Sequence, residues 1–291
     1  MRKLKSILVS ILKYALYLIL SLLLALLMRL FLFNFYVVPS DSMEPAIMSG
    51  DFILADKWTY GARIFTNLKF DSDSDPPMKR VKGFKKIRRN DVVVFNFVYR
   101  HGWNPITMNF EKIMVKRCIA LPGDSVFIKD SYYHVSGISD TLGYVAGQKQ
   151  LAKYRGILDS NIMTRTYPFD TIQHDWDIYN FGPVYIPAAG ITITLTSKNF
   201  ALHHKQIAYE TRSTVRREDS LVYINDTLAT HYTFRTNWYF VAGDKVINSQ
   251  DSRYIGLIPE AYIIGRASRI LTSKDRDTGK RRWNRILKRI K

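Results

Sequence analysis

The chain opens with its most hydrophobic segment. Residues 14–28 carry no charge, and after Arg29 the apolar run continues as far as Val38. Because a helix needs about 20 apolar residues to cross the hydrocarbon core of a bilayer, we predict one membrane-spanning helix over residues 14–33, with Arg29 reaching toward the interface. A cleavable leader is the alternative interpretation, but the small-residue cleavage site typical of leaders is missing at the end of this run.

The residues that flank this segment predict its orientation. Arg2, Lys3 and Lys5 precede it, and basic residues before a first span favour a cytoplasmic N-terminus. Aromatic residues suited to the far interface follow, namely Phe31, Phe33, Phe35 and Tyr36. We therefore expect a cytoplasmic N-terminus and anchor over residues 1–33 and the remainder of the chain on the outer side of the membrane.

After the anchor, the pattern favours strands. Short runs rich in Val, Ile, Thr and Tyr alternate with turn residues, and no long stretch after Asn90 keeps a 3.6-residue period before the tail. The predicted strands are 51–57, 91–97, 113–121, 125–129, 191–196, 221–224, 237–242 and 261–270. The expected fold class is mostly β: a single N-terminal transmembrane helix followed by a β-rich core.

The spacing of these strands indicates a core in two parts. We predict core segments over residues 34–136 and 235–271, with an inserted β subdomain over residues 137–234. Within the first part, an acidic loop at 71–77 runs into a segment dense in lysine and arginine at 79–89. A solvated loop and a specific lipid site are both open interpretations of this segment.

The tail, residues 272–291, has a pattern of its own. Trp283, Ile286, Leu287 and Ile290 recur at helical spacing, and the positions between them are mostly Arg and Lys. This pattern is typical of a basic amphipathic helix that lies in the membrane interface. Packing of the tail against the β-rich body is the competing interpretation.

Composition narrows the partners and the compartment. The net charge is +18, but no recognised nucleic-acid motif accompanies it, so we expect membrane lipid rather than nucleic acid as the anionic partner. Cys118 is the single cysteine, which excludes an intrachain disulfide. Its apolar neighbours indicate a packed strand residue rather than a nucleophile.

Two side chains stand out as candidate chemistry. Ser42 lies just after the apolar segment, and a serine hydroxyl needs a base to become a nucleophile. None of the six histidines has the context of a Ser-His-Asp site, and His203 with His204 lacks a third metal ligand at a recognised spacing, so we expect no metal and no cofactor. Lys116 remains, since burial among apolar neighbours would lower its pKa. From the pattern alone, an ordinary surface lysine stays open.

Four separated motifs then resemble bacterial type I signal peptidase, in the order in which that family carries them. They are Pro39-Ser40-Asp41-Ser42-Met43-Glu44-Pro45, Asp91-Val92-Val93-Val94-Phe95, Lys116-Arg117-Cys118-Ile119-Ala120-Leu121-Pro122-Gly123-Asp124, and Gly243-Asp244 with Asn248-Ser249-Gln250-Asp251-Ser252-Arg253. The resemblance implies a β-rich core, a Ser-Lys dyad, and removal of signal peptides from exported preproteins at the outer side of the bacterial inner membrane.

The resemblance also implies roles for individual residues. Ser42 matches the nucleophile and Lys116 the general base, while Ser40 matches a donor of the oxyanion hole. Ser249 matches the serine that orients the lysine. The remaining matches are a structural ion pair and three residues of the substrate pockets, namely Asp251, Arg253, Tyr36, Val38 and Val115.

One departure from the family pattern stands in the last motif. The family usually has Gly-Asp-Asn-Arg where this chain has Gly243-Asp244-Lys245-Val246. This change leaves two alternatives open: a catalytically impaired, membrane-tethered paralogue that binds exported chains, and a peptidase with a narrow set of clients.

Overall fold

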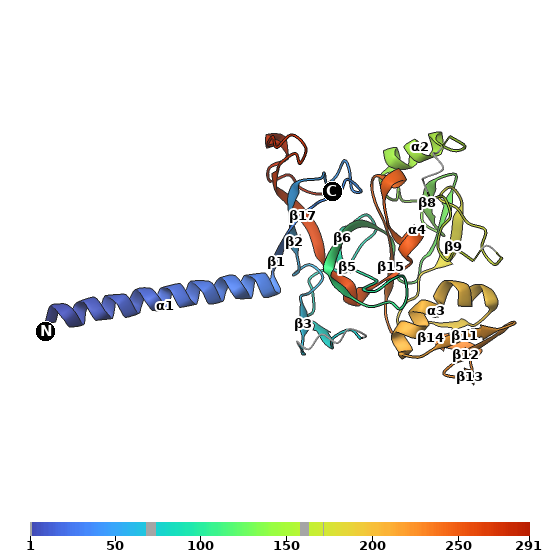
Figure 1. Cartoon of the computed structure of the whole chain (residues 1–291), viewed down its shortest axis with the longest axis horizontal. Coiled ribbons are helices and arrows are strands. Elements are labelled where there is room, and N and C mark those ends of the chain that lie inside the picture. Colours follow the sequence, from blue (N-terminus) through green and yellow to red (C-terminus); the bar gives the residue numbers. More distant parts are fainter. Residues whose placement is uncertain (1, 68–73, 158–162, 171) are drawn as a thin grey trace.

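A long helix projects from a β-rich body (Figure 1). The computed structural model describes residues 2–67, 74–157, 163–170 and 172–291. Helix α1 (Arg2–Phe31) contains the segment Lys5–Phe31, which is long and apolar enough to cross a membrane and is not covered by the rest of the chain. The N-terminal apolar helix is thus confirmed, and its composition is consistent with a single-pass anchor.

The far end of this helix differs from the prediction. Helix α1 ends at Phe31, and strand β1 (Phe33–Val37) begins two residues later, so residues expected at the membrane interface belong to a sheet. The Lys57 backbone amide donates to the Leu32 carbonyl oxygen, and the Lys57 ammonium donates to the carbonyl oxygens of Arg29 and Leu30. These bonds satisfy helix-terminal carbonyls that have no partner within the helix.

The body is built on a seven-stranded antiparallel sheet in the order β1-β2-β17-β5-β6-β15-β16. The strands after β1 are β2 (Asp51–Asp56), β5 (Val92–Phe97), β6 (Asn109–Ala120), β15 (Trp238–Ala242), β16 (Ile258–Pro259) and β17 (Ile263–Ser273). Every strand predicted from the sequence overlaps an observed strand, and the β-rich fold class is confirmed.

Strand β5 has a hydrophobic core on each face. Val92 and Val94 contact a small cluster with Ile53 and Met43, whereas the alternate residues, such as Val93, belong to a large cluster that fills the rest of the body. Because side chains alternate across a strand, a strand buried on both faces is expected to be apolar at nearly every position. In β5 only Asn96 is polar, and its side chain is hydrogen-bonded to Arg63 and to the Asn109 carbonyl oxygen.

A short hairpin carries the acidic and basic loops. It consists of β3 (Arg63–Phe65) and β4 (Met78–Arg80). Of the predicted loop at 71–77, residues 71–73 lie outside the described part of the chain. Asp75 accepts hydrogen bonds from the Met108 backbone amide and the Tyr262 hydroxyl. This part of the loop is therefore bound to the body rather than freely solvated.

The sequence pattern predicts a purely β insertion, but the insertion also contains helices. Its elements are α2 (Val145–Lys153), β9 (Phe181–Tyr185), β10 (Thr192–Thr194), α3 (Ser197–Thr211), β11 (Val215–Glu218), β12 (Leu221–Ile224), β13 (Thr227–Leu228) and β14 (His231–Thr233). Helix α3 buries His203 and Gln206 beside Leu202 and Ile207. Polar residues on the buried face hide a helical period, which is why this helix was missed.

The insertion also shares its core with the rest of the body. Strand β9 pairs with β7 (Ser125–Lys129), which in turn pairs with β8 (Tyr132–Val135). Leu202 and Ile207 of α3 belong to the same large cluster as Trp238 of the main sheet. The insertion and the rest of the body therefore share one continuous hydrophobic core.

The tail forms no amphipathic helix; a turn over residues 275–279 reverses the chain, and a 3-10 turn, η3 (Trp283–Arg285), follows. Trp283 and Leu287 are 70% and 61% exposed, while Ile290 is buried in the small cluster. Arg285, expected on the polar face, instead points inward and forms a buried ion pair with Asp51. This ion pair and the bridge from Arg289 to Arg269 of β17 hold the tail against the body, so the helix prediction is wrong and packing on the body is the observed state.

Candidate active site

Ser42 lies in the loop that joins β1 to β2. The side chains of Met43 and Ile47 anchor the loop, since both are fully buried in the small cluster. The Ser42 carbonyl oxygen accepts a hydrogen bond from the Lys245 backbone amide at 3.1 Å. The nucleophile candidate is thus fixed on both sides, by apolar packing and by the last motif.

Lys116 approaches Ser42 from the middle of β6. Its Nζ lies 2.6 Å from Ser42 Oγ, although the two residues are 74 positions apart in the chain. The side chain is only 2% exposed. Burial lowers the Lys116 pKa to about 8, against the opposing charge of Asp251, because an ammonium loses its hydration in the interior. A neutral amine is therefore accessible near physiological pH.

Ser40 is the second hydroxyl at this position. Its Oγ lies 3.3 Å from Ser42 Oγ, and its side chain is exposed. The two hydroxyls face the same opening. A reacting carbonyl placed against Ser42 would therefore lie within reach of Ser40.

Ser249 lies close to the pair but makes no hydrogen bond to Lys116. It follows η1 (Val246–Asn248) and packs on Gly243. A Cβ atom at Gly243 would lie 2.1 Å from Ser249 Oγ and 2.5 Å from the Ser42 carbonyl oxygen. Glycine is thus required here by close approach of neighbouring groups, whatever its backbone angles.

Asp251 and Arg253 form an ion pair that is fully buried. Asp251 precedes the short helix α4 (Ser252–Ile255) and also accepts from the Gly243 backbone amide at 2.9 Å. Despite its burial, the Asp251 pKa is lowered, since Arg253 and these hydrogen bonds stabilise the carboxylate. The Arg253 guanidinium donates to the Val246 carbonyl oxygen as well. The pair therefore holds the last motif against Ser42.

Lys245 makes a contact that sequence reasoning missed. Its ammonium pairs with the Asp41 carboxylate and lies 3.6 Å from the Glu44 carboxylate. The Asn248 side-chain amide donates to the same Asp41 carboxylate. Lys245, which departs from the family pattern, thus binds the loop of Ser42 through ion pairs. The sequence shows opposite charges on these two motifs, but charge alone does not reveal that the two motifs are in contact.

A cavity of about 370 Å³ opens beside the hydroxyl and amine pair. The three residues predicted for substrate pockets, Tyr36, Val38 and Val115, all line it together with Ser42 and Lys116. Tyr36 and Val115 also pack on the small hydrophobic cluster. The wall that these three residues form beside the reactive groups is therefore largely apolar.

A buried amine lies at hydrogen-bonding distance from a serine hydroxyl, with a partly apolar cleft alongside. A base in contact with a hydroxyl is the arrangement that activates a serine as a nucleophile. The chain carrying it is a β-rich body that follows an apolar N-terminal helix.

Comparison with known proteins identifies the family. The family model described as "Signal peptidase, peptidase S26" matches residues 11–272, and the chain belongs to this family. It is 27% identical to signal peptidase I of Buchnera aphidicola subsp. Acyrthosiphon pisum, over 86% of this chain and 71% of that protein. Signal peptidase I of Aquifex aeolicus is also 27% identical, over 82% of this chain and 75% of its own.

Shorter matches extend to other bacteria. Signal peptidase I S of Bacillus subtilis is 30% identical over 61% of this chain and 69% of that protein. A solved signal peptidase I from Enterococcus faecalis V583 aligns with 62% of this chain and 97% of its own, at 22% identity and a TM-score of 0.29. Family membership implies signal peptides as the class of substrate.

Proposed function

We propose that this chain is an endopeptidase that removes signal peptides from exported preproteins, with Ser42 as the nucleophile and Lys116 as the general base. The observation that carries the proposal is the 2.6 Å contact between Ser42 Oγ and the buried amine of Lys116. A lysine can act as a base only in its neutral form, and its lowered pKa of about 8 makes that form available.

The reaction proceeds by acyl transfer. The neutral Lys116 amine takes the Ser42 proton as Oγ attacks the carbonyl carbon of the peptide bond to be cleaved. The resulting ammonium gives that proton to the leaving amine, so that the C–N bond breaks and an acyl-enzyme remains. Water, deprotonated by the same amine, then releases the signal peptide and regenerates the serine.

Negative charge on the carbonyl oxygen needs donors. We assign this role to the Ser40 hydroxyl and the Ser42 backbone amide, and Ser40 is supported by its position 3.3 Å from Ser42 Oγ. A single donor of this kind contributes about 3 kcal/mol to transition-state stabilisation in comparable sites. Ser249, packed on Gly243, and the Asp251–Arg253 pair act as support for the pair rather than as chemistry.

The substrate binds as an extended strand in the cavity. Strand β1 pairs only with β2, and β15 pairs with β6 only from Arg117 onward, which leaves two strand edges without a partner in the described sheet. Residues 36–43 and 112–116 line the cavity between these edges. Backbone hydrogen bonds would supply affinity, and the apolar wall near Tyr36, Val38 and Val115 would select short side chains.

The proposed location follows from the N-terminal helix. Helix α1 anchors the chain in the cytoplasmic membrane, the basic N-terminus faces the cytoplasm, and the β-rich body works on the outer side. Preproteins that emerge from the membrane would thus meet Ser42 close to the point where α1 ends.

Incubation of the detergent-solubilised full chain with a preprotein tests the proposal. We expect mature product from the native chain and none from Ser42→Ala or Lys116→Met, with N-terminal sequencing to locate the cut. If none of the three cleaves but all bind the preprotein equally, the chain is a binding paralogue and the proposed activity is refuted.

A further inference from the structure

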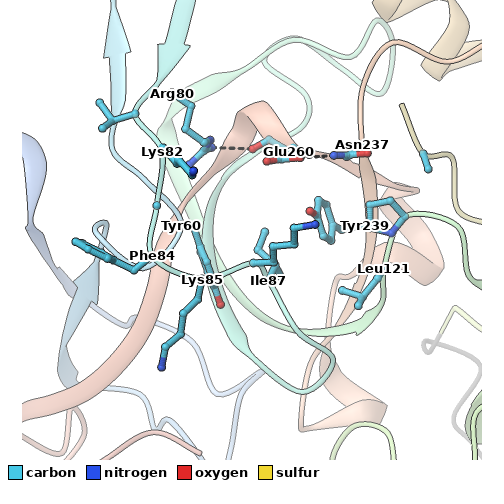
Figure 2. Close-up of a pocket in the computed structure, with 15 residues that line it drawn as sticks. Tyr60, Arg80, Lys82, Phe84, Lys85, Ile87, Leu121, Asn237, Tyr239 and Glu260 are labelled. Carbon is cyan, nitrogen blue, oxygen red and sulfur yellow. Dashed lines mark hydrogen bonds between the residues drawn. The ribbon is translucent and has the colours of Figure 1, made fainter. Parts of the chain in front are cut away.

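A second and larger cavity lies elsewhere on the body (Figure 2). Its volume is about 740 Å³, and none of its lining residues lines the Ser42 cavity. The basic segment after β4 forms one wall, and Leu121, Asn237 and Tyr239 contribute to the other. Figure 2 shows Phe84 and Lys85 across the cavity from Leu121 and Tyr239.

The charges around this cavity are unbalanced. Arg80 is already committed, since its guanidinium donates to the carbonyl oxygens of Gly61, Glu260 and Ile263. The one carboxylate of the lining, that of Glu260, accepts from the Asn237 amide.

Three further cations of the lining have no such partners. Among the described residues, the ammonium groups of Lys82, Lys85 and Lys86 have neither a hydrogen bond nor an ion pair, and all three side chains are exposed. An anion is therefore the ligand that this cluster favours.

Aromatic rings continue from the cavity toward the membrane helix. Phe84 is 84% exposed and Trp58 48% exposed, and their ring centroids lie 6.4 Å apart. Trp58 in turn packs edge-on against Phe33, at 5.8 Å, two residues beyond the end of α1. A cavity of about 290 Å³ beside the two exposed rings is lined by Trp58, Thr59, Phe84 and Lys85.

The position of these rings is fixed relative to α1. Lys57 Nζ donates to the Arg29 and Leu30 carbonyl oxygens at 2.6 and 3.2 Å, which ties the residue before Trp58 to the helix terminus. If α1 spans the bilayer, Trp58 and Phe84 lie at the level of the headgroups. Exposed aromatic side chains beside lysines are typical of segments that rest in that layer.

We propose that this cavity binds the headgroup of an anionic phospholipid, with the phosphate at Lys82, Lys85 and Lys86 and the glycerol and first acyl carbons against Phe84 and Trp58. The proposal rests on the membrane anchoring proposed above for α1, but not on the proposed chemistry. Each basic residue near an anionic membrane surface strengthens the interaction. The aromatic rings favour a lipid over a free phosphate, because a free phosphate has no apolar part to pack against them.

Native mass spectrometry of the full chain extracted from nanodiscs tests the site. With phosphatidylglycerol discs, we expect at least one retained lipid, and none with phosphatidylcholine discs. The triple variant Lys82→Gln, Lys85→Gln, Lys86→Gln should bind phosphatidylglycerol about 10- to 100-fold more weakly. The matched control is Lys129→Gln, Lys149→Gln, Lys153→Gln, which removes the same charge from exposed positions of β7 and α2. It should retain the native affinity.

Several results would overturn the proposal. Equal weakening in the two triple variants would mean a non-specific response to net charge, and unchanged affinity in the first would place the lipid elsewhere. Displacement of the lipid by glycerol phosphate at equal concentration would indicate a phosphate site without lipid character. Preprotein cleavage in detergent is assayed in parallel, and both triple variants should cleave at the native rate. If the native chain itself does not cleave, the proposed peptidase activity is refuted, whereas the lipid-binding test is unaffected.

Discussion

Two lysines of this protein have the same depressed pKa and different surroundings. Burial lowers the pKa of Lys116 in the cleft and of Lys57 at the foot of α1 to about 8. The Lys57 ammonium donates to two helix carbonyl oxygens, which hold no proton that it could remove. Lys116 instead faces the Ser42 hydroxyl, which has one to give. A lowered pKa therefore makes a lysine available as a base, and only its partner makes it useful as one.

The largest effect separates the two lysines directly. Lys116→Met should lower kcat/KM for a preprotein at least about 1,000-fold, since Ser42 then lacks a base. Lys57→Met should stay within a few-fold of the native value. Cleavage assays on both variants, with circular dichroism to verify folding, check this prediction. Comparable losses in the two would show that burial of a lysine, not contact with Ser42, is what matters.

Gly243→Ala tests how precisely Ser42 must be positioned. The added Cβ would displace Ser249 and the Ser42 backbone, which approach within 2.1 and 2.5 Å of it. Because small shifts of a nucleophile cost much of the rate, we expect about a 100-fold loss of kcat. Gly279→Ala serves as the glycine control: at φ 70° it strains its own backbone, but its Cβ would have no neighbour closer than 3.8 Å and would leave the Ser42 loop unchanged. A fully active Gly243→Ala protein would contradict the packing described for this loop.

Lys245→Met should have an intermediate effect. Without the Lys245 ammonium, the carboxylates of Asp41 and Glu44 lose their ion pairs with it. The loop of Ser42 is then held less firmly, and we expect about a 10-fold lower kcat/KM. The unpaired Asp41 carboxylate also raises the Lys116 pKa, which moves the pH dependence of cleavage upward. Lys245→Arg keeps the charge and should restore both. Loss of rate with no change in the pH dependence, or no rescue by arginine, would limit Lys245 to a structural role.

Lys57→Met should have the smallest effect, and on stability rather than on rate. It removes two hydrogen bonds to the end of α1, each worth about 1 kcal/mol. We expect a lower unfolding temperature of the detergent-solubilised protein and faster proteolysis at the junction of α1 and β1. An unchanged unfolding temperature would mean that the helix and the body are not coupled through this residue.

Prediction from the sequence succeeded where one residue type decides one local structure. The uncharged run of residues 14–28 predicted a long apolar helix, and the nearly continuous apolar run of residues 91–97 predicted a strand. It failed where a polar side chain is buried in the folded protein. His203 and Gln206 masked the helix α3, and Arg285 was placed on a polar face before its partner Asp51 was known.

The candidate site shows the same division. Ser42 and Lys116 were proposed from their motifs, but their contact across 74 residues depends on the pairing of β6 with the rest of the sheet. The ion pair of Lys245 with Asp41 was invisible because nothing local to Lys245 identifies its partner. Long-range contacts of this kind are set by topology, which a single sequence pattern does not encode.

The pH dependence of kcat/KM for the native chain tests the central claim most directly. If Lys116 is the base, cleavage should be half-maximal near pH 8, fall about tenfold for each pH unit below that, and level off above it, as the amine loses its proton. Lys57→Met should give the same curve. A half-maximal rate near pH 6.5, where histidine titrates, or a rate independent of pH between 6 and 9, would contradict a lysine base at Ser42.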